Sequence, residues 1–516
     1  MISKSKDIIL TYKTDGKKKI KLFGYDFVNN NKEKCSFIYK GKEYELVEYF
    51  MPDFEDSKND LDNEDNLSLE LDEKIENEGE SLDILNAFLT TIEITLKGLN
   101  KVSNLSYLFH NCYSLVNITN LSELNTFKVT DMSFLFAHCI SLVNLPDISK
   151  WNTTNVVNIR SMFSSCEKIK QLPNIAKWDV SNVRNMKFLF YNCLSLTSFP
   201  DLSCWDTTNV EDMSNMFSGC GQVKYLPNLS KWITSKVTNI SDLFNKCGQL
   251  ISLPDISKWD VSKVIDISNL FSNCSSLMEI TDISKWDISN VEDISYLFLS
   301  CKNLQILPDI SDWNTSKVIN MSGVFMDCQG LIELPDISKW NTGNVTSLSE
   351  MFSGCKLLTH IPQINNWNVS KVTNLENMFE GCCSLLIAPD LNKWDVSNVF
   401  KTSGMFKNCK SLTNFPNLDN WNISKIINMR EMFKGCHSLT NIPNSILYQF
   451  FEKNEEIYYY FFDECFSLNV YPTKLNAYYN KDCINSFKKD YLIDKNANNE
   501  NKDKTENNLI NIIEED

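Results

Sequence analysis

The chain has 516 residues, of which 43% are hydrophobic, so it can form a large packed interior. Its formal net charge is -16 and it has no basic stripe, which argues against nucleic acid as a partner, because phosphate binding needs grouped Lys and Arg. Residues 1–13 contain only a short apolar run, and no stretch approaches the roughly 20 apolar residues that span a bilayer. From these features we expect no signal peptide, no membrane span and a cytoplasmic location.

Two regions precede the main body of the chain. Residues 1–50 are expected to form a small β-rich N-terminal domain, since short runs rich in Ile, Tyr and Phe are separated by turn residues such as Asp15-Gly16. Residues 51–81 are expected to be an acidic, disordered linker, because residues 53–80 hold thirteen acids and only two lysines. This linker can serve as a solvated tether or as an acidic docking segment.

A strict repeat dominates residues 82–472. All eleven tryptophans stand 27 residues apart, from Trp151 to Trp421. When the Trp is counted as position 0, complete frames begin at residues 97 and 124 and continue to 448, which gives about fourteen units. A fixed period of this size is typical of a solenoid, in which each unit packs on the next.

Each unit has signals for one short helix and one short strand. Position 7 is usually Asn or Asp, which suits a helix N-cap, and position 14 is often Gly or Asn, which suits a left-handed stop. Between them we expect a helix of about one and a half turns, with the Phe at position 12, such as Phe271, turned inward. The SLxxLP motif that follows, as in residues 141–146, predicts a strand that stacks in parallel and ends at proline.

Fourteen of the eighteen cysteines follow one repeat position, from Cys112 to Cys465, the last of them after a two-residue slip. A residue in phase with the repeat is expected to be a small buried hydrophobe, and we interpret the file as reduced core thiols, which suits a reducing compartment. Cys35, Cys204, Cys383 and Cys483 follow no pattern. None of the cysteines forms a CxxC pair, so a zinc site is not expected.

The order V-x-x-M/I, MFxxC and SLxxLP resembles the BspA-like leucine-rich repeats. Residues 205–217, WDTTNVEDMSNMF, resemble the related repeats of mycoplasma-type surface proteins, and the resemblance extends over about residues 97–472. It implies an α/β fold: a leucine-rich repeat solenoid of about fourteen 27-residue units, each a short strand plus a short helix, with a small N-terminal β cap. It also implies, for many members, a surface or adhesion role.

Candidates for chemistry are few. His110 and His138 fall at neighbouring positions of adjacent units, but no third metal ligand repeats with them. Aspartates recur at position 23, where they can hold Ca²⁺ or cap their own turn. The tryptophans can stack a ligand or stack on one another. No catalytic pattern stands out from the repeat, so we expect a protein that is not an enzyme and has no cofactor and no bound metal.

The variable pair between the two strand leucines is the best place to expect recognition, because its residues change from unit to unit on a constant frame. Drift at an unconstrained surface would look the same. The candidate partner-binding residues are Lys224, Tyr225, Glu279, Gln305, Glu333 and His360.

We therefore predict a non-enzymatic protein-protein interaction scaffold that uses an extended leucine-rich repeat surface. The alternative is a cell-surface adhesin or host-interaction protein of the BspA-like type, exported by a route that the sequence does not show. Residues 473–516 are expected to be a mostly disordered tail. The sequence identifies neither the protein partner nor the oligomeric state.

Overall fold

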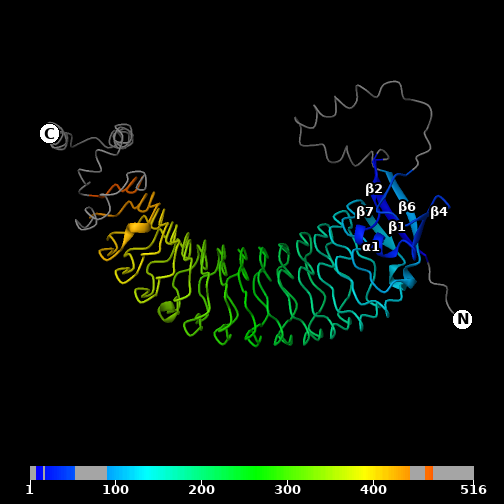
Figure 1. The fold of residues 1–516 in the computed structure, drawn as a ribbon, viewed down its shortest axis with the longest axis horizontal. Helices are drawn as coiled ribbons and strands as arrows, with labels where there is room; N and C mark the ends of the chain where they lie inside the picture. The colour runs from blue at the N-terminus through cyan, green and yellow to red at the C-terminus, as the bar shows by residue number, and fades with distance from the viewer. Residues whose placement is uncertain (1–6, 16–17, 53–89, 442–459, 469–516) are drawn as a thin grey trace, which may run out of the picture.

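The computed structural model describes residues 7–15, 18–52, 90–441 and 460–468. Residues 53–81 of the predicted linker and the whole predicted tail lie outside the described residues. The described part of the chain forms an open arc, with a small sheet at one end and stacked repeat units along the rest (Figure 1). No helix in this part is both long and apolar enough to cross a bilayer.

A small antiparallel sheet closes the N-terminal end of the arc. The cap and the first unit contain β1 (Ile8–Thr14), β2 (Ile20–Lys21), α1 (Tyr25–Asn31), β3 (Ser36–Tyr39), β4 (Lys42–Glu45), β5 (Tyr49–Phe50), β6 (Thr90–Lys97) and β7 (Leu115–Thr119). Five strands form one sheet in the order β4-β3-β6-β1-β7, and β2 pairs with β5. Because β7 occupies positions 18–22 of the first repeat unit, this sheet joins the cap directly to the array.

The cap also supplies what a preceding repeat unit would supply. Alternate residues of β1 are buried, as expected for a strand with one face in the core. The Cys112 thiol, the first of the cysteine file, donates to the carbonyl oxygen of Leu22 in the cap (3.2 Å). In the next unit the Cys139 thiol donates to the carbonyl oxygen of Phe109 (3.2 Å), and each later unit repeats this bond to the Phe of its predecessor. The cap thus provides the acceptor that the first unit would otherwise lack.

Files of identical side chains fill the interior of the array. The Phe271 and Phe298 rings stack with centroids 5.7 Å apart, and stacked tryptophans such as Trp205 and Trp232 lie 6.3 Å apart. The Trp259 indole N–H donates to the carbonyl oxygen of Leu229 (3.3 Å), so its polar atom is satisfied inside the core. The predicted inward position of Phe271 is confirmed, because the side chain is fully buried.

The short helix predicted for each unit is wrong: the described repeat units contain turns there. Within positions 8–15 the main-chain N–H groups alternate between acceptors in the next unit and acceptors in their own unit. The N–H of Phe271 donates to Leu297 of the next unit (3.0 Å), whereas the N–H of Cys274 returns to Phe271 (3.2 Å). Positions 10 and 14 have positive φ angles, as at Asn269 (55°) and Asn273 (59°), and an α-helix cannot contain such residues. The left-handed conformation expected at position 14 is confirmed, but it closes a turn and not a helix.

The predicted strand at SLxxLP is also only partly formed. It is regular in β7, and single parallel bridges join position 20 of two later pairs of units. A continuous series of parallel bridges runs instead through position 7, from Asn104 to Asn428. Two features limit pairing at SLxxLP: the N–H of position 18 bonds back within its own unit, as from Leu277 to Cys274 (3.1 Å), and proline has no N–H to donate.

The remaining helical elements are single 3-10 turns. They are η1 (Leu99–Lys101), η2 (Leu121–Glu123), η3 (Ile337–Lys339) and η4 (Ile423–Lys425). The last two begin after Asp336 and Asn422, whose side chains accept a hydrogen bond from the N–H two residues later. The position 7 side chains do the same, as Asp266 accepts from the N–H of Ser268 (2.9 Å), so they cap turns and not the helix N-termini that the sequence predicted.

Candidate interaction surface

Two apolar positions hold a variable pair on the outside of each unit. Leu304 and Leu331 at position 18 are fully buried, and Leu307 at position 21 is nearly so. The residues between them face solvent, and main-chain hydrogen bonds join some pairs of successive units at position 19, as from Ile332 N–H to the Gln305 oxygen (3.3 Å). We call this surface the position 19–20 stripe; it comprises residues 224–225, 251–252, 278–279, 305–306, 332–333, 359–360 and 386–387.

The six residues predicted to bind a partner all lie on this stripe, and all six are exposed. Lys224, Tyr225, Glu279, Gln305, Glu333 and His360 come from units that stack close together along the array. Their role in binding remains a prediction.

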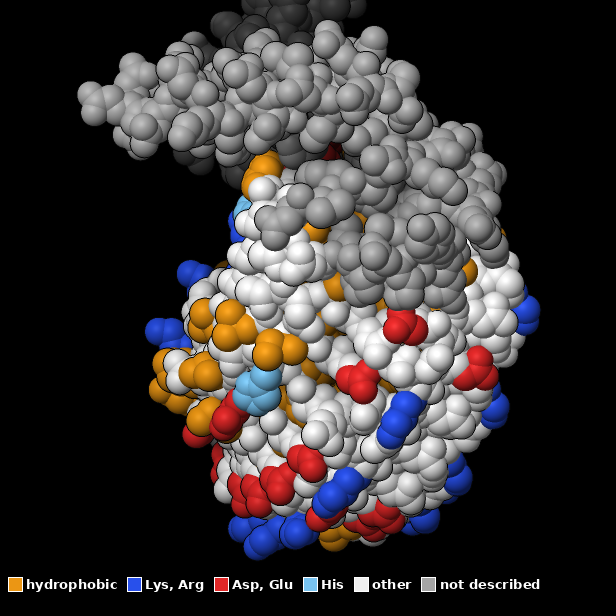
Figure 2. All heavy atoms as spheres, turned by 90° about the vertical axis from the view of Figure 1, so that its left-hand side faces the viewer, with side chains coloured by type: hydrophobic (Ala, Val, Ile, Leu, Met, Phe, Trp, Pro, Cys, Tyr) orange, Lys and Arg blue, Asp and Glu red, His pale blue; other side chains and the backbone are white. Residues whose placement is uncertain are grey.

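Of the large apolar members of the stripe, the six selected residues include only Tyr225. Tyr225, Met278 and Ile306 are each more than 60% exposed. Large exposed apolar side chains also occur at Ile251, Ile332, Leu386 and Ile387. Seen from the C-terminal side, exposed hydrophobic side chains gather along one edge of the array (Figure 2). Contiguous apolar surface of this kind marks interaction sites in soluble proteins.

The large apolar side chains of the stripe are concentrated in one part of the array. The two units before this part carry the polar pairs Lys170-Gln171 and Thr197-Ser198, and the unit after it carries Thr413-Asn414, although an exposed valine, Val143, holds position 19 in one earlier unit. Unconstrained drift would scatter large apolar residues over all units. Their concentration between residues 225 and 387 therefore favours a binding surface over drift.

A row of acidic side chains follows the stripe at position 23 in most of its units, with Asn228 and Gln363 as the exceptions. Asp255, Asp282, Asp309 and Asp336 are exposed. Hydrogen bonds from a serine side chain and main chain hold the pKa of each below its ordinary value, so these groups are ionised at neutral pH. Their side chains cap their own turns, as Asp255 accepts from the N–H of Ser257 (3.0 Å). The apolar stripe therefore has a regular negative border.

The other sites considered from the sequence have structural roles. The tryptophans are buried and bonded to main-chain oxygens, so they stack on one another and present no face to a ligand. The rings of His110 and His138 do approach, with centroids 6.0 Å apart. No group of three or more His, Cys, Asp or Glu side chains suited to a metal ion occurs among the described residues.

The cysteine file is chemically protected. The described ladder cysteines, Cys112 to Cys465, are buried. Burial raises the pKa of Cys193, Cys301 and Cys355 to about 12, which suppresses the reactive thiolate. In contrast, Cys204 is exposed. Because the ladder thiols are inert wherever the protein resides, they do not identify its compartment.

Comparison with known proteins places the repeat in a family. The family model described as "Mycoplasma protein of unknown function, DUF285" matches residues 103–224, 195–305, 221–331, 276–384, 329–446 and 358–469. No curated protein matches the chain significantly.

Similar solved structures are leucine-rich repeat proteins. A leucine-rich repeat protein from Bacteroides ovatus is 19% identical with a TM-score of 0.37, and the match covers 68% of this chain and 85% of that one. A leucine rich cell surface protein from Faecalibacterium prausnitzii is 22% identical with a TM-score of 0.32, and the match covers 57% of this chain and 77% of that one.

Proposed function

The chain belongs to the mycoplasma-type, BspA-like family of leucine-rich repeat surface proteins, and from this membership we propose that it is a non-enzymatic binding protein that acts at the cell surface. The position 19–20 stripe is the surface that engages its protein partner. The single observation that carries this proposal is the concentration of exposed apolar side chains on that stripe between residues 225 and 387.

The chemistry of the stripe specifies what the partner must offer. Its apolar centre requires an apolar face, and its negative border, together with Glu279 and Glu333, requires basic side chains around that face. A protein surface of Leu, Ile or aromatic residues rimmed by Lys or Arg meets both needs. The extended shape of the stripe suits a partner that contacts several units at once.

The proposed location is the cell surface and not the cytoplasm. The cytoplasmic expectation depended on residue patterns near the N-terminus and on the reduced cysteine file. The buried file is compatible with either compartment, because thiols without access to oxidants stay reduced. Family membership then supports the surface role that the repeat resemblance implies.

An affinity-capture experiment with matched variants tests the binding surface. One variant carries Met278→Ser, Ile306→Ser and Ile332→Ser on the stripe. The control carries Ile265→Ser, Ile319→Ser and Ile427→Ser, three exposed apolar residues at position 6, of which the first two lie in the same units as Met278 and Ile332. We expect a partner that the wild type and the control retain and the stripe variant loses, and whose binding weakens when salt screens the acidic border. Equal retention by the stripe variant and the wild type would overturn the proposal.

Location is tested separately through Cys204, since this cysteine is exposed. A maleimide that cannot cross membranes is added to intact cells, and the peptide containing Cys204 is followed by mass spectrometry. Surface location predicts labelling in intact cells. Labelling only after lysis would return the protein to the cytoplasm, while Cys204→Ser shows that the signal comes from this thiol.

A further inference from the structure

A second surface, at positions 9 and 10 near the N-terminal end of the array, contains an arginine between two aromatic rings. The Arg160 guanidinium carbon lies 5.5 Å from the Phe134 ring centroid and 5.9 Å from that of Phe188. These rings belong to the units before and after that of Arg160. The Tyr107 ring stacks on Phe134 with centroids 4.6 Å apart, so the file extends over four consecutive units.

The residues of this file differ from those that most units have at positions 9 and 10. Position 9 is serine in most units, but it is Arg160 and then Lys187 in two successive units. Position 10 is small, polar or acidic in most other units, but it is aromatic at Tyr107, Phe134 and Phe188. The intervening position 10 residue is the small, buried Ser161, which leaves room for the guanidinium between the rings.

The three aromatic residues are held in an unfavourable backbone conformation. Tyr107, Phe134 and Phe188 have φ angles of 61°, 56° and 58°, in the left-handed region. Asn, Asp and Gly tolerate that region, and several other units place them at this position, whereas bulky residues do not. Strain of this kind is found preferentially at binding and active sites. Position 10 has a positive φ in every described unit, so the distinctive feature here is the bulky aromatic residue at three of these positions, two of which flank Arg160.

The arginine has no anionic partner of its own. Among the described residues Arg160 forms no ion pair, and its Nε has no hydrogen-bond partner. The neighbouring Lys187 ammonium lies 3.9 Å from a carboxylate oxygen of Asp212. His110, which packs edge-on against Phe134, is neutral at pH 7, because burial and His138 lower its pKa to about 4. Arg160 thus provides the uncompensated positive charge of this surface.

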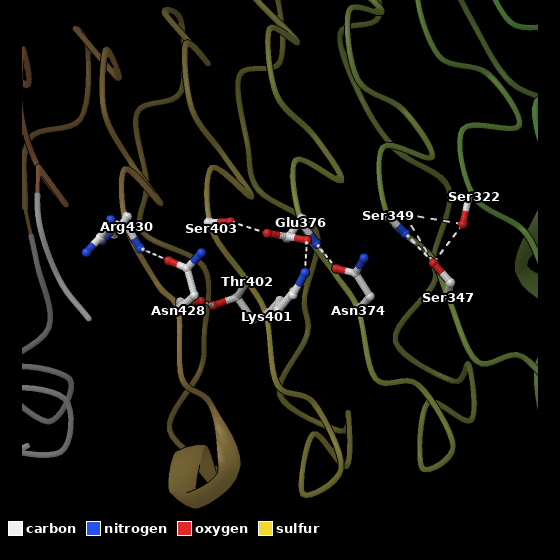
Figure 3. A network of polar contacts seen from close by, with 10 residues as sticks. All are labelled: Ser322, Ser347, Ser349, Asn374, Glu376, Lys401, Thr402, Ser403, Asn428 and Arg430. Atoms are coloured by element: carbon white, nitrogen blue, oxygen red, sulfur yellow. Dashed lines mark hydrogen bonds and ion pairs between the residues drawn. The ribbon is translucent and has the colours of Figure 1, made fainter. Parts of the chain in front are cut away.

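The same face is organised differently toward the C-terminal end. There Glu376 accepts a hydrogen bond from the Ser403 hydroxyl (2.8 Å) and lies 3.4 Å from the Lys401 ammonium (Figure 3). Lys407 is likewise paired, with Glu431 (2.7 Å). Charges on that part of the face neutralise one another within the chain, so an unpaired arginine is not a general property of positions 7–10.

We propose that Arg160, clamped by Phe134 and Phe188, binds a carboxylate of an acidic segment in a protein partner. The two rings cover the faces of the guanidinium and leave its edge for an anion, and an Arg edge matches a carboxylate with two parallel hydrogen bonds. The ring edges next to it carry partial positive charge and so favour the same anion. The site lies apart from the position 19–20 stripe and goes beyond the function proposed above.

Binding of short peptides tests this site. Hexaglutamate and hexaglutamine are titrated by calorimetry into the full chain at about 0.15 M salt, which screens repulsion from the chain's negative charge. Arg160→Ser introduces the residue that most units have at position 9, and Phe188→Asn introduces one that several units have at position 10. The matched control is Tyr296→Asn, an aromatic at position 10 whose unit has Ser295 at position 9.

We expect hexaglutamate to bind the wild type and the Tyr296→Asn control equally, and hexaglutamine not to bind. Arg160→Ser is expected to weaken hexaglutamate binding about ten- to hundredfold, and Phe188→Asn to weaken it severalfold while leaving the thermal midpoint the same or higher. Equal affinity of Arg160→Ser and the wild type, or no binding to the wild type at millimolar peptide, would refute the site. Tighter, Arg160-dependent binding of hexagalacturonate would overturn the protein ligand in favour of an acidic saccharide.

Discussion

The interior files and the position 19–20 stripe obey opposite rules. Position 12 is Phe and position 15 is Cys in every unit from residue 97 to 447, and both are buried. On the stripe, neighbouring units carry different pairs on a backbone that hardly changes. An interior side chain packs against its own copies above and below, so one change disturbs three units. A stripe side chain meets mainly solvent. In this molecule, therefore, the repeated residues reveal the fold, and the residues that depart from the repeat form the surfaces proposed to bind partners.

The largest effect on the interior files is expected from a change in the phase of the repeat. Deleting residues 259–271 sets turn positions against SLxxLP positions in all units that follow, and we expect the array to unfold. Deleting residues 259–285 removes one whole unit and keeps every file in register, so we expect a stable array. Circular dichroism melts distinguish the two, and equal loss of structure in both would show that stacking in this register does not hold the protein together.

A smaller test removes one member of an interior file. Phe271→Ala is expected to lower the free energy of unfolding by ~3 to 5 kcal/mol, because it leaves a cavity between the stacked rings of Phe244 and Phe298. Denaturant unfolding measures the change. Phe271→Leu keeps most of the volume and serves as the control, with a smaller expected loss. An unchanged midpoint for the alanine variant would contradict the stacked interior.

Much of the fold follows from the sequence, because the 27-residue phase identifies which side chains share a file. The turns at positions 8–14 could not be distinguished from a helix by the same means. An Asx residue followed by Gly or Asn seven residues later is typical of both, and the choice depends on hydrogen bonds to the next unit, such as Phe271 N–H to Leu297. One signal was present: Asn215, Asp242, Asn269 and Gly323 at position 10 favour a left-handed residue within the supposed helix.

The cysteine file makes the stability of the interior depend on pH. An exposed thiol has a pKa near 9.0, and burial raises that of Cys301 to about 12. As pH rises, the thiol of the unfolded chain therefore loses its proton first. The contribution of the buried thiol to the free energy of unfolding is fully present below pH 9 and is lost as pH rises above it. Each such thiol is expected to lower the free energy of unfolding by ~1.4 kcal/mol per pH unit in that range.

Urea unfolding at several alkaline pH values measures this slope. Cys301→Ser keeps a donor for the carbonyl oxygen of Phe271, which Cys301 contacts at 3.1 Å, but serine does not ionise there. We expect its slope to be shallower than that of the wild type by about the contribution of one thiol. Identical slopes would show that the folded thiol ionises as easily as the unfolded one.

The binding surfaces were only partly predictable. The position of the stripe follows from the variable pair, since two buried leucines fix its frame. The variable pair includes Ile306 and Met278, but their exposure could not be read from the sequence, because it is a property of the stack. The Arg160 site was missed because its parts lie in separate units. The available signal was the loss of serine at position 9 in two successive units.

The smallest expected effect is that of a substitution on the stripe. Comparing it with a substitution two positions away tests the contrast between stripe and interior most directly. Ile306 on the stripe is 61% exposed, whereas Leu304 is fully buried. The Ile306 side chain makes few contacts within the protein. We therefore expect the free energy of unfolding of Ile306→Asp to stay within about 0.5 kcal/mol of the wild type. Leu304→Asp buries a charge among apolar files and is expected to disrupt the unit. Both are measured by denaturant unfolding. A loss above about 2 kcal/mol for Ile306→Asp would mean that position 20 belongs to the core, because only substitutions of buried side chains lower stability that much. Apolar residues at position 20 would then serve packing, and their concentration would no longer indicate a partner.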